Sequence, residues 1–482
     1  PGAPPGGAPG VRAMAPVAGA ALLAGLLAGV RPAGGVVLSA RRGDDDWPRW
    51  PGHTRTTDGP TPAQLGQSRL PRERPREVGQ LRRQQMDVCE RDYPEYVGYL
   101  NRQFGNRTAT DQDLDREPGL GQSPFAPGGL GRLGITFTAT EDGRVKMEMT
   151  QKPRGEPIKL SGLLTLMQGV VDRHSDLLAE ELRAAGGHVT LFWRYMGGDC
   201  PETRRTEGLP LHGWSSDWSH TDIAMPDFTF TEYKDIRSKD VNPEWTSNGW
   251  KEVQERLHKI KKTKRGFVYR GSMSNKAREM LGEVANSPPP ERLKGLLAEV
   301  APDGFDVSMM QHEGSKKENF LSIYDQCEYA YTFHVAGKHY SANLKYKLAC
   351  NQTVFMIGRK AYLKEEFWYE ALRYGKNIFF IKEDFSNFWD VIEEALQPQD
   401  GLPAGKRAEI VARQGRELAD TYLSERGIDC YVNMYLTEYY IPLWSRARFI
   451  HGDPLLNSTL QMRLDDAARG FEAMQTASEC MA

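Results

Sequence analysis

Two stretches of the chain place phosphate-binding residue types directly after an apolar run. One stretch is FVYRGSMSNKARE and the other is FHVAGKHYSANLKYKLAC. Arginine and lysine supply positive charge, glycine lets the backbone approach a ligand closely, and serine adds a hydroxyl donor. The residues concerned are Arg270, Gly271, Ser272, Gly337, Ser341 and Lys345. Taken alone, either stretch could simply connect a strand to a helix, but two in one sheet predict a site for a diphosphate-bearing ligand.

The elements around these turns alternate between strands and helices. Short β-branched or aromatic runs predict strands at 266–269, 329–335, 353–358 and 377–382. Helical patterns separate and follow them at 276–285, 361–375, 386–396, 404–424 and 429–443. Earlier in the chain, a helical pattern over 160–185 is followed by an apolar strand at 188–193. This alternation predicts a doubly wound α/β protein, in which anionic ligands bind where strands end and helices begin.

Composition excludes several function classes. The 482 residues include 62 Lys plus Arg and 64 Asp plus Glu, so the chain lacks the basic footprint of a nucleic-acid-binding protein. There is no Walker motif and no GxGxxG, which disfavours a P-loop NTPase or a conventional dinucleotide site. CxxC and HExxH are also absent, and the acidic triplet at 44–46 lies in a polar stretch. We therefore expect no metal and no cofactor.

The amino-terminal region is typical of a protein that enters the secretory pathway. Residues 17–30 form an apolar run that resembles the core of a signal peptide or a short signal anchor, with a small-residue cleavage site near Ala40. Residues 41–80 are rich in Pro, Arg and Gly and predict a disordered stem. The folded part is expected to begin at Leu81.

Glycosylation sequons and cysteines favour the same compartment. The candidate glycosylation sites are Asn106 and Asn457, because the third sequon, at Asn351, precedes an apolar run and is expected to be buried. The six cysteines permit up to three disulfides, and their number alone does not define the pairing. Residence in the lumen of the endoplasmic reticulum or the Golgi is expected.

The sequence resembles the glycosyltransferases of family 90, which include protein O-glucosyltransferases and capsule-associated xylosyltransferases. The resemblance runs from about Cys89 to Leu443, through PFAPGGL, TLFWRYMGGDCPE, TDIAMPDFTF, FVYRGSMS, DQCEYAYTFHVAGKHYSANLKYKLAC, KEDFSNFWDVIEEAL and RGIDCYVNMYLTEY. It implies a GT-B fold with two facing Rossmann-like domains. These would be an acceptor-side domain at 81–240 and a nucleotide-sugar domain at 241–425, with a C-terminal helix and tail at 426–482 that returns to the first domain.

The resemblance also implies a mechanism. Asp199 takes the position of the family's catalytic carboxylate, although an aspartate after two glycines is otherwise usually a turn residue or a cap. It would act as general base toward an acceptor hydroxyl, which attacks the anomeric carbon of a UDP-sugar in one inverting step. Side chains of the two turns would offset the charge of the diphosphate in place of a metal. They are Arg270, Ser272, Ser341 and Lys345, beside a cradle formed by Gly271 and Gly337.

Two disulfides follow from the same resemblance. Cys327 would pair with Cys350 around the nucleotide cradle, and Cys89 with Cys430, which leaves Cys200 and Cys480 without an assigned partner.

The chain also departs from the family in two places. Asn343 stands where the animal O-glucosyltransferases carry an arginine, and ASECMA lacks a KDEL-like signal. The donor, glucose or xylose, is therefore left open.

Three functions remain in competition. The first is transfer to a protein of the secretory pathway, and the second is the same chemistry on a glycan or polysaccharide acceptor. The third is a catalytically silent carbohydrate-binding protein on the same fold, against which the retained Asp199 and Arg270 argue. The partners expected are therefore a UDP-sugar and a protein or glycan acceptor, with no nucleic acid.

Overall fold

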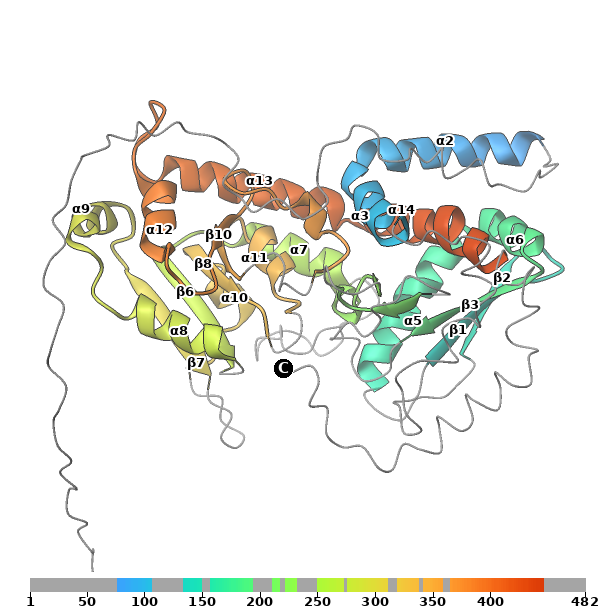
Figure 1. Cartoon of the computed structure of the whole chain (residues 1–482), viewed down its shortest axis with the longest axis horizontal. Coiled ribbons are helices and arrows are strands. Elements are labelled where there is room, and N and C mark those ends of the chain that lie inside the picture. The colour runs from blue at the N-terminus through green and yellow to red at the C-terminus, as the bar shows by residue number, and fades with distance from the viewer. Residues whose placement is uncertain are drawn as a thin grey trace, which may run out of the picture. The chain divides into compact units, whose positions relative to one another are not determined.

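The residues that the structure describes form two β-sheets with helices around them (Figure 1). The structure is a computed structural model, and it describes residues 76–105, 133–149, 157–193, 210–216, 222–231, 249–272, 275–310, 319–337, 341–358 and 365–445. Of the candidate site residues, cysteines and glycosylation sites named above, those outside these ranges are Asp199, Cys200, Cys480, Asn106 and Asn457.

One sheet is entirely parallel and has the strand order β10-β9-β8-β6-β7. Its strands are β6 (Lys264–Ser272), β7 (Phe305–Met310), β8 (Tyr329–Val335), β9 (Thr353–Ile357) and β10 (Phe379–Ile381). The four strands predicted in this half are confirmed, and β7 is an addition. Strands β8 and β9 are buried almost throughout, as expected where helices cover both faces of a parallel sheet.

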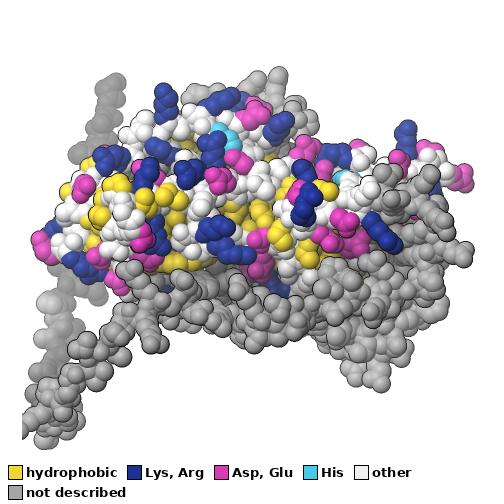
Figure 2. Space-filling view, turned by 90° about the horizontal axis from the view of Figure 1, so that it is seen from above, with side chains coloured by type: hydrophobic (Ala, Val, Ile, Leu, Met, Phe, Trp, Pro, Cys, Tyr) yellow, Lys and Arg dark blue, Asp and Glu magenta, His cyan; other side chains and the backbone are white. Residues whose placement is uncertain are grey.

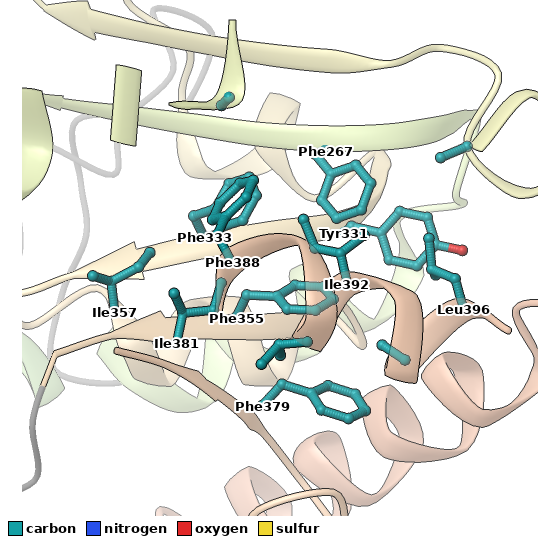
Figure 3. Packing of buried hydrophobic residues seen from close by; sticks show 14 of the residues in the cluster. Phe267, Tyr331, Phe333, Phe355, Ile357, Phe379, Ile381, Phe388, Ile392 and Leu396 are labelled. Atoms are coloured by element: carbon teal, nitrogen blue, oxygen red, sulfur yellow. The ribbon is translucent and has the colours of Figure 1, made fainter. Parts of the chain in front are cut away.

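The helices of this half are α7 (Gly249–Lys259), α8 (Lys276–Ala285), α9 (Glu291–Val300), α10 (Ile323–Gln326), α11 (Leu344–Ala349), α12 (Phe388–Leu396) and α13 (Lys406–Tyr422). In Figure 3, Phe388, Ile392 and Leu396 of α12, spaced four residues apart, pack onto aromatic side chains of the strands. Phe267 of β6 stacks on Tyr331 of β8, with ring centroids 4.7 Å apart. This core gives the strand ends a rigid base.

The other sheet is mixed, with the order β2-β1-β3-β4-β5. Its strands are β1 (Leu133–Ala139), β2 (Val145–Met149), β3 (His188–Trp193), β4 (Leu211–Gly213) and β5 (Ile223–Ala224). Strand β1 is antiparallel to both neighbours, whereas β3, β4 and β5 are parallel. A tight turn with Gly143 at a φ of 84° joins β1 to β2, and so short a connection can only produce an antiparallel pair. The first sheet in the chain is therefore not the uniformly parallel sheet of a simple βα repeat.

Helices on this sheet include α5 (Pro157–Arg173) and α6 (Ser175–Ala184). The single helical pattern predicted over 160–185 is thus two helices, which break at His174.

The two ends of the described chain lie together. Helices α2 (Arg76–Asp92) and α3 (Pro94–Gly105) begin it, and α14 (Glu425–Met434) with the π-helical turn η6 (Tyr435–Tyr440) closes it. In Figure 1, α14 runs beside α3 and α5, and a disulfide joins α2 to α14 through Cys89 and Cys430. The carboxyl-terminal helix therefore packs against the helices that begin the described chain.

Two boundaries differ from the sequence-based expectations. Helix α2 begins at Arg76, so helix already covers the last residues of the predicted stem at 41–80. The helix predicted at 361–375 is wrong for its described part, where Glu365 pairs with Ser216 through the backbone and a 3-10 turn, η5, spans Tyr369–Ala371. Residues 365–369 are all buried, and this pattern suits a segment covered on every side better than an amphipathic helix, which would expose one face.

The surface matches the near-neutral composition. On the face shown in Figure 2, basic and acidic side chains are interspersed, and neither sign dominates. No helix within the described ranges combines the length and the apolarity needed to span a membrane. The apolar run at 17–30 lies outside those ranges.

Candidate functional site

Strands β6 and β8 separate at their carboxyl ends. Their ladder ends at the pair Val268 and Thr332, after which β6 continues beside β7 to Ser272 and β8 continues beside β9 to Val335. The chain leaves β6 toward β7 on one side and reaches β8 on the other side, so this gap is the topological switch point of the sheet. Ligands of open α/β sheets bind at such a point, outside the carboxyl ends of the strands. Of the two polar stretches singled out in the sequence, one forms the last residues of β6, Arg270 to Ser272, instead of a turn, and the other begins after β8.

Asn275 ties the two turns together. Its Oδ1 accepts a hydrogen bond from the backbone N–H of Arg278 and so caps α8. Its Nδ2 donates to the carbonyl oxygens of Ala336 and Gly337, at 2.9 and 3.0 Å. The turn after β6 and the turn after β8 are therefore parts of one site.

Arg278 spans the gap between the strand ends. Its guanidinium donates to the carbonyl oxygen of Ser272 at 2.9 Å and to the carbonyl oxygen of Val335 at 3.3 Å. A further bond reaches the hydroxyl of Ser272 at 3.2 Å. Among the described residues, the buried Nε of Arg278 has no hydrogen-bond partner, and no carboxylate pairs with this side chain.

Gly271 is required by a close approach inside the protein. A Cβ at this position would stand 2.3 Å from the hydroxyl oxygen of Tyr269, so any larger residue would displace that ring. The hydroxyl of Tyr269 is buried and has no hydrogen-bond partner among the described residues, and burial raises its pKa to about 12.

Arg270 is engaged by protein groups rather than by open solvent. Its guanidinium donates to Asp306 Oδ1 at 2.6 Å and to the carbonyl oxygens of Asp306, Tyr269 and Asn319. Although burial opposes ionisation of Asp306, hydrogen bonds from Tyr329 and Arg270 lower the pKa of its carboxyl. The Arg270 guanidinium, which was predicted to bind a phosphate, thus links β6 to β7 in this structure.

Lys345 is also committed to an ion pair. Its side chain is fully buried, and its Nζ lies 3.0 and 3.3 Å from the two carboxylate oxygens of Asp227. The ammonium also lies 4.2 Å from the ring centroid of Phe230, in the 3-10 turn η2 (Phe228–Phe230). Lys345 therefore joins α11 to the segment after β5, rather than facing the gap between β6 and β8.

Glu366 completes this buried cluster. Burial raises the pKa of its carboxyl to about 8, the nearby charge of Lys345 lowers it and that of Asp227 raises it. The carboxyl accepts hydrogen bonds from Trp368 Nε1 at 3.2 Å and from the Tyr369 hydroxyl at 3.4 Å. The cluster therefore places the carboxyl groups of Glu366 and Asp227 near the same lysine, and burial disfavours the charged form of Glu366.

Ser341 lies before α11 rather than at its start. The helix begins at Leu344 and its N-cap is Asn343, which has helical dihedral angles and makes no side-chain capping bond. Ser341 is half-buried and stands two residues before this N-cap.

Sequence inspection missed Lys347 and His334. Lys347, on α11, donates from Nζ to the carbonyl oxygen of Phe333 at 2.5 Å, and its side chain is buried. Burial, and secondarily the charge of Arg278, lower its pKa to about 7. Burial lowers the pKa of His334 well below its usual range, and Lys347 and Arg278 lower it further. In the sequence Lys347 resembles any exposed helix lysine. The only signal for His334 was its place within a run that predicts a buried strand at 329–335.

The four cysteines in the described ranges form two disulfides. They are Cys327–Cys350 and Cys89–Cys430, the pairs that the family resemblance implies. Lys262 donates to the carbonyl oxygens of Cys327 and Cys350, and burial lowers its pKa to about 7. Asn351 follows directly and is half-buried instead of fully buried, whereas the next two residues of its sequon are buried.

A parallel sheet with polar turns and uncompensated cations at its switch point suits an enzyme that binds a phosphorylated donor. The family model described as Glycosyl transferase family 90 matches residues 196–450, which is more than half of the chain. The chain therefore belongs to glycosyltransferase family 90 and is a glycosyltransferase. A comparison with curated proteins gives no match.

Proposed function

We propose that the protein transfers glucose or xylose from a UDP-sugar to a hydroxyl of a secretory-pathway protein, on a GT-B arrangement. The observation that carries the proposal is the switch point between β6 and β8. There, within the matched region, Asn275 joins the turn after Ser272 to the turn at Gly337. The two disulfides suit a protein of an oxidising lumen, in the endoplasmic reticulum or the Golgi.

The proposed reaction is a single inverting displacement. Asp199 accepts the proton of the acceptor hydroxyl, whose oxygen forms the new bond to the anomeric carbon. The bond from that carbon to the β-phosphate oxygen breaks, and UDP leaves with the electron pair. In the sequence Asp199 comes six residues after the end of β3, and the segments that follow strands often carry catalytic groups.

The diphosphate is proposed to lie over the two turns. Ser272 and Ser341 offer hydroxyls there, and Gly271 and Gly337 offer backbone close to the ligand. Arg270 and Lys345 are further cations of the region, but each would first have to exchange its carboxylate partner for phosphate. No metal is proposed, because cationic side chains supply the charge.

The test is incubation of the purified protein with a panel of UDP-sugars and with protein or glycan acceptors. We expect UDP release and sugar transfer with UDP-glucose or UDP-xylose, unchanged by excess EDTA. Asp199→Asn should lower the rate by about 10²- to 10⁴-fold while UDP affinity stays near that of the unmodified protein. Transfer to glycans alone would favour the glycan acceptor, and UDP-sugar binding without turnover would favour the silent carbohydrate-binding protein.

A further inference from the structure

The gap between the ends of β6 and β8 is filled by cationic side chains from two helices. Arg278 enters from α8 and contacts Ser272 and Val335, and Lys347 enters from α11 and contacts Phe333. Lys347 also lies 5.3 Å from the ring centroid of Tyr269. The two side chains thus converge on the last residues of the two strands that flank the switch point.

The described residues do not neutralise these two charges. Neither Lys347 nor Arg278 forms an ion pair with a carboxylate among them, although their residues are only 4% and 8% exposed. Buried charges of proteins are normally paired, because desolvation of an unpaired ion is strongly unfavourable. Arg278 also lowers the pKa of Lys347, so the two cations oppose one another.

Unused polar atoms lie in the same place. The Nε of Arg278, the hydroxyl of Tyr269 and the Nδ1 of His334 are buried and lack a hydrogen-bond partner among the described residues. Buried polar atoms without partners are uncommon in folded proteins, and each calls for an explanation such as a missing ligand. Unpaired positive charge and free donors at one strand edge indicate an anion as that ligand.

We infer that Lys347 and Arg278 form a buried cationic pair that positions the diphosphate of the nucleotide-sugar donor at the ends of β6 and β8. The inference rests on the proposed function. Arg278 donates its free Nε–H toward the phosphates, and Lys347 adds positive charge from beneath the strand ends. Both are positioning residues, and neither carries out the chemical step.

The variants Lys347→Met and Lys347→Gln separate charge from hydrogen bonding. Both remove the charge, but glutamine keeps a donor for the carbonyl oxygen of Phe333. We expect each to weaken UDP binding about tenfold, as for the loss of one charge near a diphosphate. Uridine affinity should change less than twofold in both. Lys347→Met should also raise the melting temperature by a few degrees, because it removes an uncompensated buried charge.

Lys262→Met is the matched control. Lys262 is another buried lysine that donates to backbone carbonyls and whose pKa burial lowers to about 7, but it lies before β6, at the amino end of the strands. The UDP affinity of the Lys262→Met variant should stay within twofold of that of the unmodified protein.

Calorimetry with UDP and with uridine, together with thermal unfolding, decides between the outcomes. The inference would be overturned if Lys347→Gln bound UDP as tightly as the unmodified protein, or if Lys347→Met did. The proposed function would still stand in either case. Equal loss of UDP and uridine affinity would also overturn the inference. If the unmodified protein binds no UDP, the proposed function fails and takes this inference with it.

Discussion

The ion pair between Lys345 and Asp227 offers the sharpest test of how the two sheets are joined. The pair is buried on both sides, with side chains 0% and 1% exposed and a shortest distance of 3.0 Å. Replacement of Lys345 by methionine fills a similar volume but removes the buried ammonium that pairs with the carboxylate of Asp227. Removal of one partner of a buried pair typically costs about 3–5 kcal/mol of folding free energy.

A second replacement, Asp227→Asn, should restore much of the folding free energy that Lys345→Met loses. Asp227→Asn keeps an oxygen that can accept from the backbone N–H of Thr229, at 3.0 Å in the structure, so the local cap survives. The double variant then has neither buried charge, and we expect it to be more stable than Lys345→Met alone. The loss in the single variant should also grow as pH rises, because Glu366 and Asp227 then repel one another.

Urea denaturation of the two single variants and the double variant gives the coupling energy. The control is Lys406→Met, because Lys406 pairs with Glu409 at 2.6 Å on the surface, with side chains 48% and 66% exposed. Lys406→Met should change the free energy of unfolding by no more than about 0.5 kcal/mol. If Lys345→Met costs no more than Lys406→Met, the buried pair does not hold the sheets together and the reasoning is wrong.

Three further changes have defined outcomes. Glu366→Gln should raise the melting temperature by an amount that grows from pH 5 to pH 8. The unfolded carboxyl loses its proton near pH 4.5 but the folded one only near pH 8, so stability falls across that window, and a pH-independent difference would refute this. Removal of the disulfide by Cys327→Ala with Cys350→Ala should cost roughly 3 kcal/mol, measured by denaturation, since it closes a loop of 23 residues; no change would contradict the entropic argument. Gly271→Ala should lower the free energy of unfolding by about 1–3 kcal/mol, because the added methyl group overpacks the site. Adding Tyr269→Phe should recover part of it, because the hydroxyl is the closest clashing atom.

Several strands could be predicted from the sequence because their signals were local. The run YAYTFHV predicts a strand at 329–335, which is where β8 lies, and HVTLFW predicts β3 equally well. Such buried strands carry unbroken β-branched and aromatic residues between polar turns. In contrast, β6 extends three residues beyond its predicted end at 269, because pairing with β7 continues through Arg270, Gly271 and Ser272.

The partners of the cations could not be predicted, because they depend on contacts between distant segments. Lys345 and Lys347 are two residues apart in one short helix and look alike in the sequence. The first meets Asp227, which lies 118 residues earlier, whereas the second meets a backbone carbonyl beside Arg278. The same reason hides the ion pair of Arg270 with Asp306. Residue types and local spacing thus locate the switch point, but only the folded chain shows which cations remain without a carboxylate there.

The bond between Cys89 and Cys430 has a consequence for synthesis of the chain. Its two cysteines are 341 residues apart, whereas Cys327 and Cys350 are separated by 23. At about 5–20 residues per second, roughly 20–70 s pass between translation of Cys89 and of Cys430, but only about 1–5 s between those of the second pair. During that interval a thiol on the emerging chain can attack other disulfides, so Cys89 is open to wrong partners until the last described helix arrives. Correct oxidation of Cys89 therefore depends on a partner that the ribosome supplies 341 residues later.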